Sequence, residues 1–268
     1  MKSSNRGSLF KVLLDLLPSG NLSLYKFCKN YVCKYNGEND GDIETNGELH
    51  FMQQELPKCK TVFDIGANIG DWAKISQQIN PKLNLHCFEP SISTFQHLLS
   101  NHFSSNVICN NFGFSSKSGK ACLHSFGAGS ALNSLYKRQG LEDYGISQQQ
   151  VTETVELKTV DEYCKANGLQ KIGIDFCKID VEGHELEVFK GAKEMLREKA
   201  ISIIQFEYGG CNIDSRVLLK DIFEFFEQFD YTFYKIFPKK LEQVSRYSQL
   251  FENFQYQNWA IIANGNNK

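Results

Sequence analysis

The chain has 268 residues, 41% of them hydrophobic, which is enough to build a sizeable core in one or two domains. Its 29 basic and 31 acidic residues nearly balance, so the composition gives no case for nucleic acid, which usually needs a concentrated basic face, or for attraction to an anionic membrane. No uninterrupted apolar run approaches the roughly 20 residues that span a bilayer. We therefore expect a soluble protein with neither a nucleic-acid nor a membrane partner.

The cysteines and the first residues bear on the compartment. Nine cysteines are scattered singly without a C-x-x-C pair, which supports neither a zinc site nor a disulfide framework and suggests a reducing compartment. The apolar stretch near the start is interrupted by Lys11 and Asp15, and no small-residue cleavage pattern follows before Pro18. We interpret this stretch as a short amphipathic helix rather than a signal peptide, and we predict a cytoplasmic protein.

The predicted elements begin with helical spacing over residues 1–58, broken by a loop at 36–47 that is rich in Gly, Asn and Asp. From there the pattern alternates between strand and helix, except over the irregular stretch 113–154, which holds one further strand candidate at 121–126. The predicted strands are 61–65, 83–88, 107–110, 176–181, 201–206, 231–237 and 258–263. The predicted helices are 71–78, one that contains Phe95 and Leu98, 160–167, 185–199 and 214–229.

Strands that alternate with helices predict a parallel sheet covered by helices on both faces. We expect an N-terminal helical extension of residues 1–58 and a single catalytic domain of residues 59–268. In such a sheet the ligand binds at the carboxyl ends of the strands. The residues that end the strands are therefore the most informative ones for function.

The first strand leads into the segment Asp64–Gly70, with the sequence DIGANIG, and then into a helix. Gly66 permits a sharp turn with a positive φ, and Gly70 permits close packing of the helix. Asn68 stands where the dinucleotide fingerprint has a glycine that admits a pyrophosphate, and asparagine is among the few residues that adopt left-handed geometry. Glu89 ends the next strand, where a carboxylate can accept the hydrogen bonds of an unphosphorylated ribose. The pattern favours a nucleoside-like ligand over the simpler interpretation, a tight turn with a solvated glutamate.

A second group of polar residues follows the strand at 176–181. Asp180 and Glu182 lie on the same side of an extended strand, and Gly183 turns the chain into the next helix. Acids at a helix start are also stabilised by local amide donors, so capping with solvation remains an alternative for Glu182 and Glu185. Asp180 lies between apolar neighbours, which makes this alternative weaker there.

At these motifs the sequence resembles the FkbM-type methyltransferases. The matching segments are 62–70, 88–90, 157–161, 178–192 and 206–208. The resemblance covers roughly residues 60–210, and the long segment 178–192 is its specific part. It implies the Rossmann-like, seven-stranded class I methyltransferase sheet with an antiparallel C-terminal edge pair. It also implies transfer of a methyl group from S-adenosylmethionine to a hydroxyl, commonly on a sugar, a glycan or a secondary metabolite.

The resemblance also implies roles for individual residues. Glu89 holds the ribose and Asn111 lies near the adenine. The family usually has an acid a few residues after this asparagine, and Ser116 stands in its place. The methionine part is held by residues of the first turn, namely Asp64, Gly66, Asn68 and Gly70. Residues 1–58 and 120–156 lie outside the resemblance, and we expect them to carry acceptor selectivity because variable loops on a rigid scaffold usually do so.

For catalysis we hypothesise that Asp180 or His184 takes the hydroxyl proton, while Glu182 and Glu207 orient the acceptor. Each role has an alternative: Asp180 can bind the cofactor amine, His184 can be a solvated cap, and Glu207 can pair with a basic side chain. These four side chains offer oxygen and nitrogen ligands to a metal ion. Their spacing matches no dedicated metal motif, so we predict no metal.

Two other functions compete with methyl transfer. An NAD-type enzyme would use the same strand, turn and helix, but Asn68 and the lack of a His/Arg pair for hydride transfer count against it. A non-catalytic relative would bind the cofactor or a partner, and aromatic residues between 231 and 256 would suit a protein interface. Methyl transfer to a small-molecule or glycan acceptor remains the favoured function, and the sequence leaves the oligomeric state undefined.

Overall fold

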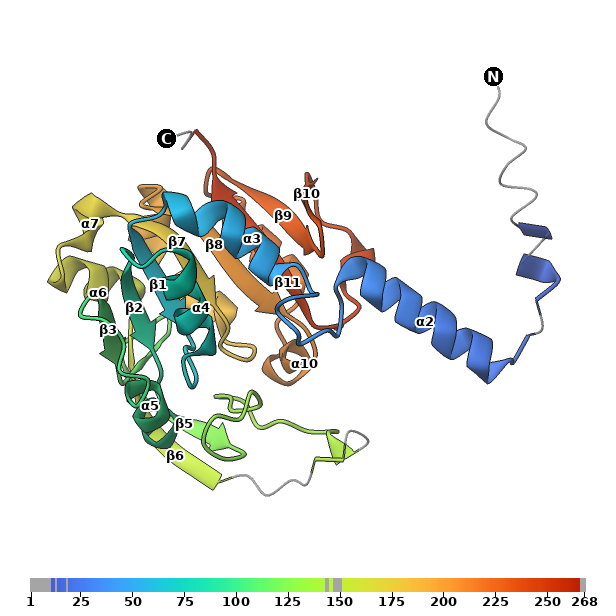
Figure 1. The fold of residues 1–268 in the computed structure, drawn as a ribbon, viewed down its shortest axis with the longest axis horizontal. Coiled ribbons are helices and arrows are strands. Elements are labelled where there is room, and N and C mark those ends of the chain that lie inside the picture. The colour runs from blue at the N-terminus through green and yellow to red at the C-terminus, as the bar shows by residue number, and fades with distance from the viewer. Residues whose placement is uncertain (1–10, 13, 18, 143–144, 147–150, 266–268) are drawn as a thin grey trace.

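The computed structural model describes residues 11–12, 14–17, 19–142, 145–146 and 151–265 (Figure 1). Its centre is a sheet of eight strands whose order from one edge to the other is β10-β9-β11-β8-β7-β1-β2-β3. Their bounds in that order are Lys240–Val244, Tyr231–Phe237, Gln257–Ala263, Ile201–Tyr208, Ile174–Ile179, Thr61–Ile65, Asn84–Phe88 and Val107–Asn110. Strands β3, β2, β1, β7 and β8 run parallel, whereas β11 is antiparallel to both of its neighbours, β8 and β9.

This sheet confirms the predicted class I architecture. Each of the seven predicted strands is present, and β9 and β11 form the expected antiparallel pair. One correction concerns the edge, because β10 pairs antiparallel with β9 and adds an eighth strand. Its sequence, KLEQV, is mostly polar and largely exposed, so it carries little of the hydrophobic pattern from which a strand is predicted.

Helices cover both faces of the sheet. In β1, Val62 belongs to the apolar cluster on one face, while Phe63 and Ile65 belong to the cluster on the other. On the Val62 face pack α3 (Glu48–Glu55), η1 (Leu56–Lys58), α4 (Asp71–Ile79) and α5 (Ile92–Leu99). On the opposite face pack α6 (Val160–Ala166), α7 (Leu169–Ile172), α8 (Glu185–Lys190), α9 (Lys193–Arg197) and α11 (Leu219–Phe226).

Two helices predicted as continuous are each divided. The helix predicted over 185–199 is α8 and α9, separated at Gly191, where an added Cβ would lie 2.1 Å from the carbonyl oxygen of Ser115. Asp161 caps the start of α9 by accepting hydrogen bonds from two of its backbone amides. The helix predicted over 214–229 is α10 (Cys211–Ser215) and α11.

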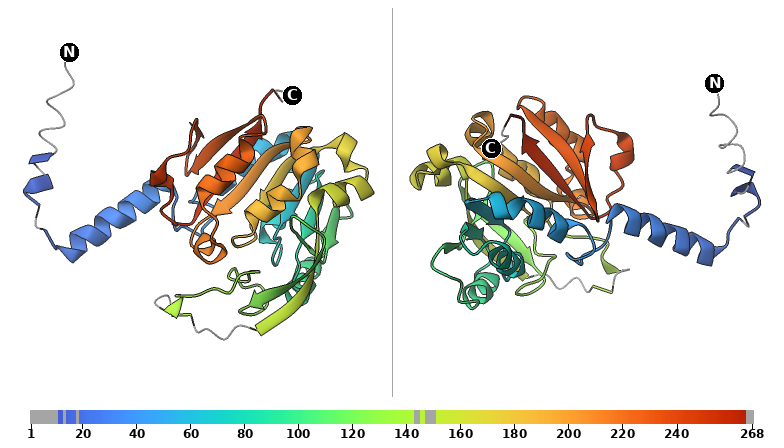
Figure 2. Two further views of the ribbon diagram at one scale, coloured as in Figure 1. Left: turned by 180° about the vertical axis from the view of Figure 1, so that it is seen from behind. Right: turned by 45° about the horizontal axis from the view of Figure 1, so that its top comes forward.

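A smaller sheet of three strands lies beyond the carboxyl ends of the main sheet (Figures 1 and 2). Its order is β4 (Gly113–Phe114), β6 (Val151–Lys158) and β5 (Gly119–Ser125). Strand β5 matches the candidate at 121–126, whereas β6 was not predicted. Residues 126–142, called here the cap segment, follow β5 and pass over the carboxyl ends of the main strands.

The N-terminal part divides into two differently packed helices. Helix α2 (Leu22–Asn36) extends away from the body, and residues 37–47 lead from it to α3 (Figure 1). Phe51 and Met52 of α3 are buried against the sheet. The short amphipathic helix predicted near the start lies largely outside the described residues, and the division at residue 58 stays a prediction. Among the described residues, no helix combines the length and apolar character needed to cross a bilayer.

Candidate active site

The turn after β1 contains three residues with positive φ. Gly66, Asn68 and Gly70 have φ values of 82°, 47° and 91°. A Cβ on Gly66 would lie 1.8 Å from the backbone oxygen of Asp180, so a side chain there would collide with the end of β7. This glycine turn (residues 64–70) is therefore fixed directly against the strand that carries Asp180.

Asp64 is the buried acid at the base of the glycine turn. Neither of its carboxylate oxygens has a hydrogen-bond partner among the described residues, although Lys178 Nζ lies 3.6 Å from Asp64 Oδ1 and 3.1 Å from Asp180 Oδ2. Burial raises the pKa of Asp64, and Lys178 opposes this shift. Burial alone would lower the pKa of Lys178, but Asp180, Asp64 and Glu48 outweigh it and raise that pKa. Unsatisfied carboxylate oxygens of this kind suit a donor such as the ammonium group of an amino acid.

Glu89 connects the end of β2 to the glycine turn. Its Oε2 accepts a hydrogen bond from Asn68 N over 3.1 Å, and its Oε1 accepts one from Ser91 N over 2.8 Å. Burial raises the pKa of Glu89 to about 7, against the opposing effect of these two bonds. Each carboxylate oxygen can accept more than one hydrogen bond, so both retain capacity for ribose hydroxyls.

The residues predicted near the adenine are engaged with the protein. Asn111 Nδ2 donates to the backbone oxygens of Glu89 and Pro90, over 2.9 and 3.1 Å. Ser116 donates its hydroxyl hydrogen to Glu187. Asn111 thus shapes the backbone beside Glu89, and Ser116 takes part in a contact with α8.

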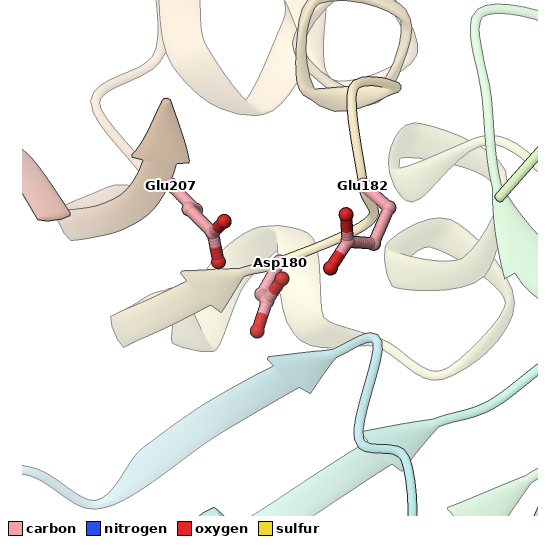
Figure 3. A group of neighbouring side chains, drawn as sticks. All are labelled: Asp180, Glu182 and Glu207. Atoms are coloured by element: carbon pink, nitrogen blue, oxygen red, sulfur yellow. The ribbon is translucent and has the colours of Figure 1, made fainter. Parts of the chain in front are cut away.

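The acidic cluster (Asp180, Glu182 and Glu207) lies beside the glycine turn, at the carboxyl ends of the adjacent strands β7 and β8. One oxygen from each of the three residues lies within 4.8 Å of the other two, and the side chains point toward one another (Figure 3). Glu182 has a φ of 52°, a left-handed conformation that is uncommon for a residue with a side chain and that is often found at functional sites. The structure therefore brings together three of the four predicted catalytic residues.

The charge of Asp180 raises the pKa values of the other two carboxylates of the cluster, Glu182 and Glu207. Burial, followed by the charge of Asp180, raises the pKa of Glu182 to about 8, although Arg138 opposes the shift. Burial and the charges of Asp180 and Glu182 raise the pKa of Glu207 well above its ordinary value. The cluster therefore holds at least one proton near neutral pH. Three carboxylates at this spacing would also accept a hard divalent cation such as Mg²⁺.

His184, the fourth predicted catalytic residue, faces a different set of neighbours. Its Nδ1 lies 2.9 Å from the Tyr136 hydroxyl, and its Nε2 lies 2.9 Å from Ser115 Oγ. Burial lowers the pKa of His184 to about 4, so the imidazole is neutral at physiological pH. Glu182 and Gly183, which has a φ of 97°, turn the chain between Asp180 and His184 and so separate the imidazole from the acids.

The cap segment contributes a residue that sequence reasoning missed. Arg138 is buried, with its Nη1 at 2.7 Å from Glu182 Oε2 and its Nε at 3.1 Å from Asp214 Oδ2. The one sequence feature that could have pointed to Arg138 is that it is the only arginine between Arg6 and Arg197. Its partners, Glu182 and Asp214, lie 44 and 76 positions away, so the residues around Arg138 do not indicate the pairing.

Two further contacts join the cap segment to both halves of the site. Ser134 Oγ donates to the backbone oxygen of Glu182 over 2.7 Å. Gly129 N donates to Thr94 Oγ1 over 3.1 Å, and a Cβ on Gly129 would lie 2.8 Å from Ile69 in the glycine turn. The cap segment therefore closes over the glycine turn at one point and over the acidic cluster at another.

The strand order, the glycine turn and the acids at the strand ends define an α/β protein of the class I methyltransferase type. Residues 64–233 match the Methyltransferase FkbM domain, and the chain belongs to that family, as the resemblance implied. The matched part of the chain is thus a methyltransferase domain.

Three known proteins illustrate the similarity. The hexuronic acid methyltransferase AglP of Haloferax volcanii is 27% identical over 177 residues, which span 65% of this chain and 66% of that protein. The crystal structure of methyltransferase FkbM from Methylobacillus flagellatus matches at 14% identity and a TM-score of 0.44, over 76% of this chain and 43% of that one. The precorrin-6y C5,15-methyltransferase of Geobacter metallireducens matches at 12% identity and a TM-score of 0.40, over 80% and 86%. At these scores the fold assignment rests on the strand order itself.

Proposed function

We propose that this chain transfers a methyl group from S-adenosylmethionine to a hydroxyl of a sugar or glycan. The observation that carries the proposal is the contact between the glycine turn and the end of β7, where Gly66 lies against the backbone of Asp180. This contact supports the proposal because it joins the glycine turn to the strand end that carries the acidic cluster. In our proposal these are the two halves of a methyl-transfer site, and they are adjacent.

The cofactor half consists of the glycine turn and Glu89. In our proposal Glu89 accepts hydrogen bonds from the ribose hydroxyls, and Asp64, with its unsatisfied oxygens, binds the ammonium group of the methionine part. The positive φ at Gly66, Asn68 and Gly70 brings the backbone close to the ligand. S-adenosylmethionine supplies an activated methyl group on a sulfonium, which becomes a neutral thioether when the acceptor oxygen takes the methyl carbon.

In the catalytic half we propose that Asp180 accepts the proton of the acceptor hydroxyl. The side chain of Asp180 is 33% exposed. It is more accessible than the side chains of Glu182 and Asp64, which are 17% and 0% exposed. Glu207, whose pKa is raised, holds a proton and donates a hydrogen bond to Asp180. Glu182, fixed by Arg138, orients the acceptor. His184 is neutral and bonded to Tyr136, so its contribution is to position the turn that carries Glu182.

Alignment contributes more to the rate than the base does. Well-oriented reacting groups can lower a barrier by about 7–11 kcal/mol. A positioned base typically contributes about 10²–10⁴-fold, equivalent to roughly 3–5 kcal/mol. The acid therefore needs only modest basicity, whereas the distance between the glycine turn and Asp180 must be well maintained.

The sugar acceptor rests on the family and on the name of the Haloferax volcanii relative, a hexuronic acid methyltransferase. The acids around Asp180 outnumber the two nearby cations, Lys178 and Arg138, and both cations are already paired. A carboxylate on the acceptor would be repelled by these acids. We therefore propose that the methylated hydroxyl lies on an uncharged part of the sugar.

We also propose that residues 59–268 form the methyltransferase domain and residues 1–58 its N-terminal extension. The compartment we propose is the cytoplasm, where the free thiols of the nine cysteines would persist. These two statements are independent of the catalytic proposal.

The proposal is tested by incubating the protein with methyl-labelled S-adenosylmethionine and a panel of neutral hexosides, uronic acids and a nucleic-acid control. We expect label on a neutral hexoside and a loss of about 10²–10⁴-fold in kcat for Asp180→Asn. Glu198→Gln, at an exposed acid that precedes β8 and so lies at the opposite end of that strand from Glu207, is the matched control and should retain full activity. Hydride transfer with NAD in place of methyl transfer, or full activity of Asp180→Asn, would refute the assignment.

A further inference from the structure

Helix α2 is a long exposed element that the methyltransferase site does not use. It spans Leu22–Asn36, contains no buried residue, and extends away from the body in every view (Figures 1 and 2). Its last turn is anchored, because the Tyr35 ring packs edge-on against Phe237 with centroids 6.1 Å apart, and Gln257 Nε2 donates to the Asn36 oxygen over 2.9 Å. The helix is thus fixed to the body at one end and presents the rest of its surface to the solvent.

The side chains of α2 are divided between two faces. At about 100° per residue, seven apolar or aromatic side chains fall on one half of the helix: Leu24, Tyr25, Phe27, Cys28, Tyr31, Val32 and Tyr35. Lys26 lies on the opposite half, and Lys29 and Lys34 lie at the two borders between the halves. Tyr35 contacts Phe237, but Phe27 and Tyr31 are 67% and 63% exposed, so this part of the apolar face has no cover within the described chain. An apolar face of this size usually marks a site of interaction.

The charge of α2 differs from that of the whole chain. The helix has three lysines and no acidic residue. The first 36 residues contain six of the chain's 29 basic residues but only one of its 31 acidic residues. We expected no membrane partner because the net charge of the whole chain is close to zero. That overall value does not reflect the local excess of positive charge in the first 36 residues. The occupant of the apolar face is therefore expected to carry negative charge.

We propose that α2 lies in the surface of an anionic lipid bilayer, parallel to the membrane plane. The apolar face enters the boundary between headgroups and acyl chains, and the border lysines reach back to the headgroups. A second copy of the chain fits less well, because a symmetric pair of α2 helices would bring lysines together without an acid to pair with them. The proposal concerns attachment to a membrane and is independent of the proposed methyl acceptor.

Vesicle sedimentation of the full chain tests the proposal. Vesicles of phosphatidylcholine with phosphatidylserine are compared with vesicles of phosphatidylcholine alone, at low ionic strength. The triple variant K26Q/K29Q/K34Q should bind the anionic vesicles about 100-fold more weakly, because each lysine near such a surface contributes about 1 kcal/mol. The matched control is K82Q/K117Q/K171Q, which removes three exposed lysines elsewhere and should bind as the unaltered protein does.

The apolar face is tested by F27S/Y31S, with Leu250→Ser as its control, since Leu250 is 86% exposed on another element. We expect F27S/Y31S to lose vesicle binding and Leu250→Ser to retain it. Thermal unfolding should be the same for all variants, because the altered side chains lie in solvent. Equal binding to neutral and anionic vesicles, or no binding by the unaltered protein, would overturn the proposal. A dimer in solution that F27S/Y31S dissociates, without vesicle binding, would instead assign the face to a second copy of this chain.

Discussion

Replacing Gly66 with alanine should separate the two halves of the site. The added Cβ would lie 1.8 Å from the backbone oxygen of Asp180, and contacts of a real Cβ are essentially never shorter than 3.0 Å. The glycine turn and the end of β7 must therefore move apart by about 1.2 Å. A misplacement of about 1 Å can reduce a rate by about 10²-fold, so we expect kcat/KM to fall by at least that factor.

Gly168→Ala is the matched control for backbone strain. Gly168 also has a positive φ, 69°, but an added Cβ there would meet no atom within 4 Å. Both variants carry the cost of left-handed backbone, about 1–2 kcal/mol, which corresponds to a fall in Tm of roughly 2–8 °C for a domain of this size. Activity is measured as methyl transfer from labelled S-adenosylmethionine, and stability by calorimetry. If Gly66→Ala loses no more activity than Gly168→Ala, the contact between the turn and β7 does not set the alignment.

Three further predictions concern the acidic cluster and its neighbours. Arg138→Met leaves the half-buried acids Glu182 and Asp214 without their cation and should lower the free energy of unfolding by roughly 3–5 kcal/mol. The pKa of Glu182 is raised to about 8, so its carboxyl group is mostly protonated at pH 6 and mostly ionised at pH 9. Denaturant titrations should therefore show a larger loss of stability at pH 9 than at pH 6. An equal loss at both pH values would contradict the pairing of an ionised Glu182 with Arg138. His184→Gln should leave the pH profile of kcat unchanged between about pH 6 and 9, since the imidazole is already neutral there; a lost limb of the profile would identify His184 as the base. Chelation with EDTA should leave methyl transfer unchanged, and a loss that Mg²⁺ restores would show that the cluster holds a cation.

The parts of the fold that could be predicted are those with local causes. The turn after β1 requires positive φ at specific positions, and the glycines and Asn68 meet that requirement within seven residues. The strands β1 and β3 begin and end at the predicted residues because their apolar runs are bounded by polar or turn residues. Strand β10 was not predicted because an exposed edge strand lacks the regular alternation of apolar residues from which a strand is predicted.

The catalytic half was predicted less completely, since its geometry depends on distant contacts. His184 was grouped with Asp180 and Glu182 because it is close in sequence, but left-handed backbone at Glu182 and Gly183 turns it toward Tyr136. The cap segment and Arg138 had no visible pattern, because their partners lie on other elements. Side chains that a turn redirects, and ion pairs between distant segments, are the features that a single sequence conceals.

The central claim, that the glycine turn and Glu89 bind the cofactor, is tested most directly by calorimetric titration with S-adenosylhomocysteine. Unaltered protein, Glu89→Ala and the surface control Glu198→Ala are compared, with thermal unfolding as the check on folding. We predict micromolar binding by the unaltered protein and the control, and its loss in Glu89→Ala, because Glu89 accepts the ribose hydrogen bonds. Absence of binding by folded, unaltered protein, or unchanged binding by Glu89→Ala, would contradict the placement of the cofactor at this turn.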